Sequence, residues 1–414
     1  VAAGYRIGRG IFQPWYLERE TEKSGEFSIG LSQPLLQGRA IDPQRFAIFQ
    51  ASLARQAADP ILQEAILTTS RDAVLAYWNW VAAGATLESQ RDLLELAEVR
   101  GRQYQVGFRA GKFAEIDVIL NNQLIAERRA TAIDRQRKFQ ESAFKLSLFL
   151  RDDAGQPLVP EDAWLPSYFP KIQPLPPTDV ENEIFTALQR RPEPRRLQIE
   201  LRQLDLDRRL AANQTLPRLD FVIKGAQDVG QPGTSSDDKG PFQLVVGAAS
   251  EVPIQRRKAR GKLRETAAKI AQVREKLRLQ QDKISIEVRT AFTSLAFSQQ
   301  VVQQAQIAFQ TALATRDRYR YAFDRGKVDL IYLNLLETKA NESEIKLIEA
   351  QRLWFAELVD FQAAAGLDPF EQADFVTQLP PSDLRSQDRQ NTNQLDEEAL
   401  DQDWQRHIAT PDEQ

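Results

Sequence analysis

The sequence contains no cysteine, and its single histidine, His407, lies in a polar C-terminal segment. The missing cysteines exclude disulfide scaffolds, thiolate zinc sites and cysteine nucleophiles for this stretch of chain. One histidine in such a segment leaves no histidine-based triad and no imidazole metal cluster in the part that we expect to fold. A Gly-rich phosphate loop and a serine-centred nucleophile elbow are also not visible. We therefore expect neither an enzyme nor a bound cofactor or metal ion.

The sequence also lacks a run of about 18 apolar residues, which a transmembrane helix requires. A signal peptide is not visible in Val1–Gly10. Methionine is absent, even at position 1, so we expect the chain to start inside a longer precursor and a substantial N-terminal segment to be missing. The net charge of −4, with 27% charged residues of both signs, argues against a nucleic-acid binder. A membrane-spanning β-barrel is still compatible with the sequence, because the strands of such a barrel are short and alternate in polarity.

The clearest positive feature is an internal repeat with a separation of 215 residues. Tyrosine, phenylalanine, glycine and lysine recur in register in two segments, Tyr104, Phe108, Gly111 and Lys112 in the first and Tyr319, Phe323, Gly326 and Lys327 in the second. This separation far exceeds the roughly 20–50 residues of solenoid repeats. We interpret the chain as a tandem duplication in which each half has the same plan.

Each half begins with sequence typical of strands. Phe27, Ile29 and Leu31 alternate with small or polar residues, which is the period of a strand with one apolar face. The same kind of alternation predicts four strands in all, two in each half: one around Tyr5, one over 27–31, one over 218–224 and one over 242–249. A strand pair of this kind cannot be stable alone in water.

Long helical stretches follow the strands. We expect long helices over 41–108 and 256–323 and shorter antiparallel helices after the Gly-Lys turns, over 113–150 and 329–366. At 1.5 Å per residue each long helix would measure about 100 Å, too long for a compact domain. Apolar residues recur at coiled-coil spacing: Leu263, Ile270, Leu277, Ile284 and Ala291, and then Leu333, Ala340, Leu347, Trp354 and Phe361. We expect Trp78, Trp80 and Trp354 to pack in the core or between helices.

These features predict six consecutive parts of the chain. The last of them, the tail over 371–414, contains eleven acidic and three basic residues, and we expect it to be disordered. The parts are a first strand pair (1–34), a helical hairpin (35–156), a Pro-rich link with a connecting helix over 178–213 (157–215), a second strand pair (216–253), a second helical hairpin (254–370) and the acidic tail (371–414).

The strands need partners that one chain cannot supply. Their edges must pair and their apolar face must meet a core or lipid. Four strands are too few to close a barrel, whereas three copies supply twelve, which leave a lumen wider than that of an eight-stranded barrel. The sequence therefore predicts a mainly α fold with a β-barrel portion: a homotrimeric channel-tunnel with long antiparallel helical hairpins and a twelve-stranded barrel.

Residues 1–367 resemble the TolC-like outer membrane efflux proteins, also called outer membrane factors. The resemblance rests on the duplicated plan and on the order of short segments: Arg191-Pro192-Glu193, Leu216–Leu219, Pro253-Ile254, Arg260–Lys262, Phe323–Gly326 and Asp329–Ile331. It implies a homotrimer in the lipid of a Gram-negative outer membrane, with the helical part in the periplasm. The family members act as passive conduits for export and work with a periplasmic adaptor and an inner-membrane pump.

The turns at the helical tips are the expected functional positions. We expect the tip residues Phe108, Gly111, Lys112, Phe323, Gly326 and Lys327 to form the reversals and to contact the adaptor, with the glycines at positive φ. The acidic rings of some family members match Tyr332 and Leu335 here, and Asp117 is the first repeat's equivalent of Tyr332. Our candidates for a pore constriction are Glu115, Asp117, Asp324, Asp329, Tyr332 and Glu337.

Several of these residues also have simpler interpretations. Asp117 and Asp329 fall in the first turns of their helices and fit N-terminal capping as well as a pore ring. Trp15 and Tyr16 fit either membrane-interface aromatics or loop packing. For the whole chain, the main alternative is a soluble coiled-coil scaffold that stays dissolved without detergent. A pump adaptor is a third class, but it would carry a single hairpin between lipoyl-like and barrel segments, and this chain has two hairpins.

Overall fold

The computed structural model describes residues 1–10, 20–166, 169–172, 179–231, 242–252, 254–325 and 327–371. The chain divides into two compact units. Unit 1 comprises Val1–Thr68, Pro176–Thr293 and Ala364–Gly366, and unit 2 comprises Thr69–Leu175, Ser294–Ala363 and Leu367–Gln414. Among the described residues, no helix has both the length and the apolar character needed to cross a membrane.

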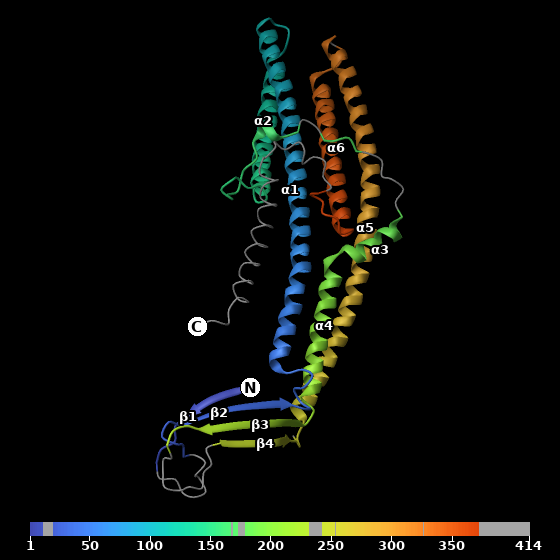
Figure 1. The fold of residues 1–414 in the computed structure, drawn as a ribbon. Coiled ribbons are helices and arrows are strands. Elements are labelled where there is room, and N and C mark those ends of the chain that lie inside the picture. Colours follow the sequence, from blue (N-terminus) through green and yellow to red (C-terminus); the bar gives the residue numbers. More distant parts are fainter. Residues whose placement is uncertain are drawn as a thin grey trace. The chain divides into compact units, whose positions relative to one another are not determined.

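The elements follow the duplicated plan along the chain (Figure 1). The first half contains β1 (Ala2–Arg6), β2 (Glu26–Pro34), α1 (Pro43–Arg109) and α2 (Glu115–Ser147). A one-turn 3-10 helix, η2 (Asp162–Trp164), precedes the second half, which contains α3 (Val180–Arg190), α4 (Pro192–Asn213), β3 (Arg218–Asp228), β4 (Phe242–Glu251), α5 (Arg257–Asp324) and α6 (Leu330–Ala364). The four predicted strands and the two long and two short helices are confirmed, each long helix within two residues of its predicted ends.

The prediction of one connecting helix over 178–213 is wrong. The segment forms α3 and α4, which are separated at Arg191, whose backbone is extended with φ −60° and ψ 133°. Pro192 causes the break, because proline disfavours a helical conformation at the residue before it and itself suits the first position of a helix. Pro60, by contrast, lies inside α1, which continues past it.

The strands of unit 1 form one antiparallel sheet in the order β1-β2-β3-β4. Two hairpins, β1–β2 and β3–β4, are joined by the pairing of β2 with β3, in which Ile29 lies opposite Gly225. This register places Ala3, Ile29, Gly225 and Leu244 in one row across all four strands. Trp15 and Tyr16, between β1 and β2 in the sequence, lie outside the described residues.

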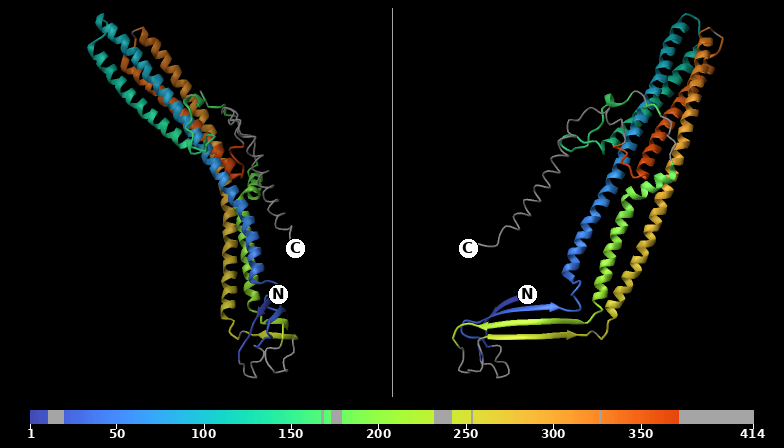
Figure 2. Two further views of the ribbon diagram at one scale, coloured as in Figure 1. Left: turned by 60° about the vertical axis from the view of Figure 1, so that its left-hand side comes forward. Right: turned by 45° about the vertical axis from the view of Figure 1, so that its right-hand side comes forward.

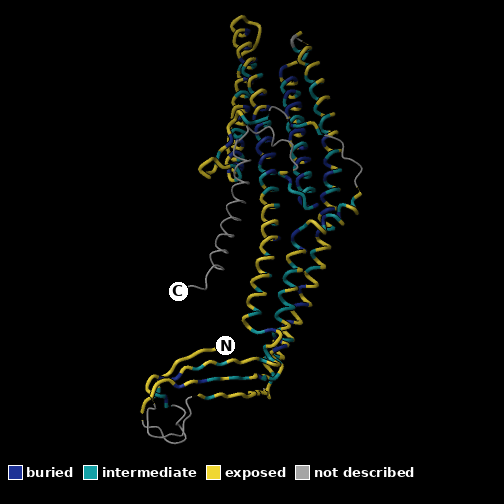
Figure 3. Tube along the Cα trace, in the orientation of Figure 1, coloured by how far each residue is buried: buried dark blue, intermediate teal, exposed yellow. Residues whose placement is uncertain are grey.

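The two faces of the sheet differ in polarity. Large apolar side chains on one face are exposed to solvent in the single chain: Tyr5, Phe27, Ile29, Phe242, Leu244 and Val246. The opposite face carries charge, with an ion pair between Arg6 and Glu26 at 2.7 Å. Figure 3 shows this exposure along β4 in particular.

The helices of unit 1 lie side by side in the order α1, α4, α5 (Figures 1 and 2). Arg195 of α4 donates to Gln63 of α1 at 3.3 Å, and Arg191 pairs with Glu287 of α5 at 3.3 Å. Of the heptad residues predicted on α5, Ile270, Ile284 and Ala291 are buried, and Leu263 and Leu277 are half-buried.

The core of unit 2 is aromatic. Trp78 and Trp80 of α1 are 2% and 1% exposed, and Trp354 of α6 is 6% exposed. Trp78 stacks on Phe355 with ring centroids 3.9 Å apart, and Trp80 stacks on Phe139 of α2 at 6.0 Å. The prediction that the three tryptophans pack in the core or between helices is confirmed.

Candidate functional site at the helical tips

The first turn reverses the chain between α1 and α2. Gly111 adopts a left-handed conformation with φ +70°, as predicted. The N–H of Lys112 donates to the carbonyl of Gly107 at 2.8 Å, which is the hydrogen bond that closes many helix C-termini. Phe108 lies at this end of α1 and is 44% exposed.

The second turn repeats this geometry. The N–H of Lys327 donates to the carbonyl of Ala322 at 3.0 Å, and both partners lie 215 positions after Lys112 and Gly107. Phe323 is half-buried at the end of α5, and Lys327 is exposed. Gly326 lies outside the described residues, and so does the side chain of Asp324. The shared hydrogen bond shows that the sequence repeat is also a structural repeat at the tips.

Two of the candidate acidic residues cap the helices that follow the turns. The carboxylate of Asp117 accepts from the N–H of Ala114 at 3.1 Å, and that of Asp329 accepts from the N–H of Tyr332 at 2.8 Å. The capping interpretation is therefore confirmed for both residues. Glu115 is exposed in the first turn of α2. Whether any of the three also lines a pore stays a prediction.

An aromatic pair lies at each of the two tips. Tyr104 lies edge-on to Phe113 with ring centroids 4.6 Å apart, and its equivalent Tyr319 lies 5.1 Å from Tyr332. Tyr104 is buried, and the burial raises its pKa to about 12. Tyr332 and Leu335, the positions that match acidic rings in some family members, are 43% and 49% exposed on α6.

Glu337 differs from the other candidates, because it is only 2% exposed. Its carboxylate accepts hydrogen bonds from Arg100 of α1 and from Arg128 of α2, the latter at 3.3 Å. Burial lowers the pKa of Arg128, and the charge of Glu337 opposes that effect. The single chain thus places Glu337 in an interior ion-pair cluster, and its part in a constriction stays a prediction.

Sequence reasoning missed Arg100 and Arg128. A signal was available: Arg100 continues the spacing of buried Leu93, Ala97 and Tyr104, and so it occupies a position that the helix gives to its core. Arg128 stands in the same way on the buried side of α2. A charged residue at such a position indicates an interior partner, but the sequence does not indicate which one.

Polar contacts continue from this cluster along the seam between α1 and α6. Ser89 donates to Glu344 at 2.6 Å, and Asn341 donates to the backbone carbonyl of Ser89 at 3.2 Å. Further along, Arg71 pairs with Asp360 at 2.6 Å. This seam joins the long helix of the first repeat to the short helix of the second.

No protein-family model and no curated protein matches the sequence. Solved structures do match. A membrane protein from Pseudomonas aeruginosa is 17% identical over 88% of this chain and 82% of that chain, with a TM-score of 0.67. The Campylobacter jejuni CmeC outer membrane channel is 14% identical over 91% and 78%, with a TM-score of 0.66. The outer membrane protein VceC from Vibrio cholerae is 15% identical over 88% and 85%, with a TM-score of 0.65.

These matches are similarities of structure at low sequence identity. They cover most of each chain. The protein has the fold of TolC-like outer membrane channels. The resemblance and the predicted fold of one protomer, long antiparallel helical hairpins with a four-stranded sheet, are confirmed at this level. The homotrimer and its twelve-stranded barrel stay predictions.

Proposed function

We propose that the protein is the outer-membrane channel component of an export or efflux system, a passive conduit from the periplasm to the exterior. The observation that carries this proposal is the apolar face of the β1–β4 sheet. Side chains such as Ile29 and Leu244, 61% and 60% exposed, form a face that needs an apolar partner. A sheet with one apolar and one charged face suits lipid on one side and a water-filled lumen on the other.

A homotrimer completes the barrel in this proposal. The outer edges of β1 and β4 have no strand partner among the described residues. Unpaired edges invite pairing with another chain, and three copies would supply the twelve strands of a closed barrel. The six parts predicted from the sequence are the domains of each protomer in this assembly.

The proposal also includes partners, and the exposed surface of the tips supports it. Known structures of this fold include an outer membrane channel, CmeC. The tips expose Phe108 and Tyr321, at 44% and 57%, together with Lys112 and Lys327. We assign this surface, with Gly111, Phe323 and Gly326, to a periplasmic adaptor that connects the channel to an inner-membrane pump.

Gating would occur at the same end of the helices. Opening requires the hairpins to move apart, and the α1–α6 seam is what joins the hairpin of the first repeat to that of the second. We assign five residues to a constriction in the closed channel: Glu115, Asp117, Asp324, Asp329 and Tyr332. Glu337, buried between the helices, follows Tyr332 along α6.

The proposal is tested by conductance. The purified full chain, added to a planar lipid bilayer, is expected to produce stepwise increases in current, each step proportional to voltage. An equal volume of detergent buffer is the control. Protein that stays dissolved without detergent and adds no conductance would contradict the proposal and favour the soluble scaffold.

A further inference from the structure

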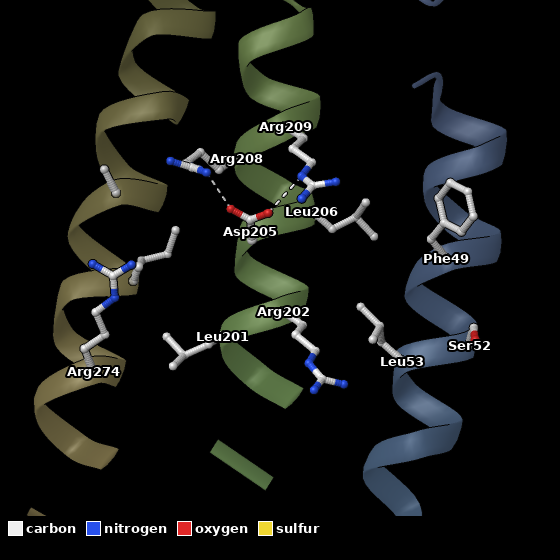
Figure 4. Close-up of a pocket in the computed structure, with 12 residues that line it drawn as sticks. Phe49, Ser52, Leu53, Leu201, Arg202, Asp205, Leu206, Arg208, Arg209 and Arg274 are labelled. Carbon is white, nitrogen blue, oxygen red and sulfur yellow. Dashed lines mark hydrogen bonds and ion pairs between the residues drawn. The ribbon is translucent and has the colours of Figure 1, made fainter. Parts of the chain in front are cut away.

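A groove of about 670 Å³ lies on the helices of unit 1 (Figure 4). Its walls come from α1, α4 and α5 of a single chain. Apolar side chains form much of its lining, with Phe49 and Leu53 from α1, Leu201 and Leu206 from α4 and Ile270 from α5. This volume is in the range of about 300–1,000 Å³ that is typical of sites for small organic ligands.

Positive charge surrounds the apolar lining. Four arginines and one acid line the groove: Arg202, Arg208, Arg209, Arg274 and Asp205. Asp205 accepts from Arg208 at 2.6 Å and from Arg209 at 2.8 Å, so its charge is shared by two guanidinium groups. Arg202 and Arg274 make no ion pair or hydrogen bond within the part of the chain that the structure describes.

The two arginines without partners lie at different margins of the groove. Arg202 lies on the side of α1 and Arg274 on α5, with Leu201 between them (Figure 4). A guanidinium group presents a planar set of donors that matches carboxylate, sulfonate and phosphate oxygens. A ligand with an apolar body and an acidic end could therefore contact the apolar lining and bind the arginine at one margin at the same time.

We propose that this groove is a binding site for amphipathic organic anions. The apolar body lies over Leu53, Leu201 and Leu206, and the acidic group binds Arg202 or Arg274. The three leucines are half-buried and the two arginines are exposed in the free protein, so the ligand replaces water on their accessible surface and not a protein partner. Binding at this groove does not depend on the channel activity, and the two can be tested separately.

The test uses a fluorescent pair of probes that differ in charge. We would titrate 1-pyrenesulfonate and the cation (1-pyrenylmethyl)trimethylammonium into the full chain held in a non-ionic amphipol, which leaves no free detergent to compete. Fluorescence anisotropy reports binding of both probes. The variant is R202Q/R274Q, and the matched control is R195Q/R278Q, which removes the same charge from the same two helices at residues that do not line the groove.

The sulfonate is expected to bind saturably to the wild type and to R195Q/R278Q, and at least about tenfold more weakly to R202Q/R274Q. The cation should bind weakly to all three proteins, and added salt should weaken the binding of the sulfonate. F49S, at a half-exposed position, tests the apolar lining and should also weaken the binding of the sulfonate. Equal sulfonate affinity in R202Q/R274Q and the control, or equal affinity for the two probes, would overturn the proposal. Neither result would bear on the proposed channel, which bilayer conductance tests separately.

Discussion

Two arginines and one glutamate occupy helix positions that normally hold apolar side chains. Arg100, Arg128 and Glu337 are 8%, 5% and 2% exposed, and together they bring two positive charges and one negative charge into the interior of unit 2. Arg128 also donates to the backbone carbonyl of Leu93 at 2.8 Å. Removing ions from water is costly, so such a cluster is stable only while each charge keeps its partners.

Replacing Glu337 with glutamine should therefore destabilise the protein strongly. E337Q keeps the size of the side chain but leaves Arg100 and Arg128 buried without a counter-ion. The expected loss is about 3–5 kcal/mol in the free energy of unfolding, as for other buried ion pairs that lose one partner. Denaturant titration followed by far-UV circular dichroism measures it.

Glu342 offers the matched control on the same helix. It pairs with Lys339 at 2.8 Å, and its side chain is 46% exposed. Because exposed ion pairs contribute about 0–1 kcal/mol, E342Q should unfold almost as the wild type does. If E337Q and E342Q unfolded at the same denaturant concentration, the buried cluster would not stabilise the protein.

A second prediction for a single residue concerns Gly111, the glycine of the first turn. A Cβ atom at Gly111 would meet no atom within 4 Å, so only its φ of +70° opposes a side chain. G111A should lower the free energy of unfolding by about 1–2 kcal/mol. Gly261 in α5 also has open space around it but no positive φ, so G261A should raise stability by roughly 0.5–1 kcal/mol. The two variants should therefore change the free energy of unfolding in opposite directions. Two changes of the same sign would contradict the explanation that the positive φ of Gly111 is what opposes a side chain.

Among the elements, periodicity decides how much the sequence can predict. The seven-residue repeat through Ile270 and Ile284 and the alternation through Phe27 and Ile29 reflect local geometry, so helices and strands follow from them. The break at Arg191 was also signalled by Pro192, although the segment was predicted as one helix. The partners of Arg100 and the arginine groove could not be predicted, because they depend on helices that meet only in the folded chain.

The β1–β4 sheet supplies a prediction for an element. Ile29 lies on the apolar face opposite Gly225 and Ala3, so a longer side chain meets no bulky neighbour across the strands. If this face contacts lipid, I29R should lower the stability of the membrane-inserted protein by about 2–4 kcal/mol at the bilayer midplane. Folding into zwitterionic lipid vesicles, followed by tryptophan fluorescence, reports the yield and the denaturant midpoint.

Ser28 provides the comparison at the next position along the strand. It lies on the charged face, opposite Ala226 and Gly4. S28R adds the same charge to the side that we assign to the lumen, so it should insert almost as well as the wild type. Equal insertion of I29R and S28R would mean that the apolar face does not contact lipid.

For the whole molecule, the two outer edges of the sheet determine the assembly. All neighbouring strands are antiparallel and their number is even, so β4 of one copy can pair with β1 of the next in the same antiparallel manner. Such head-to-tail pairing uses two different surfaces on each copy and closes into a ring only when the rotation between copies fits. A ring of three leaves no strand edge exposed.

The absence of cysteine makes this arrangement directly testable by cross-linking. One cysteine replaces Ala3 in β1, and a second replaces Leu244, Val246 or Ala248 in β4, positions on the same face of the sheet in the observed register. Oxidation should give covalent dimers and trimers and no larger species, because a closed ring of three has no free edge. Cysteines at Val245 or Ala249 point to the opposite face of β4 and should cross-link poorly with Ala3→Cys. A ladder that continues beyond three copies would indicate an open filament, and monomers alone would show that β1 and β4 do not meet between chains.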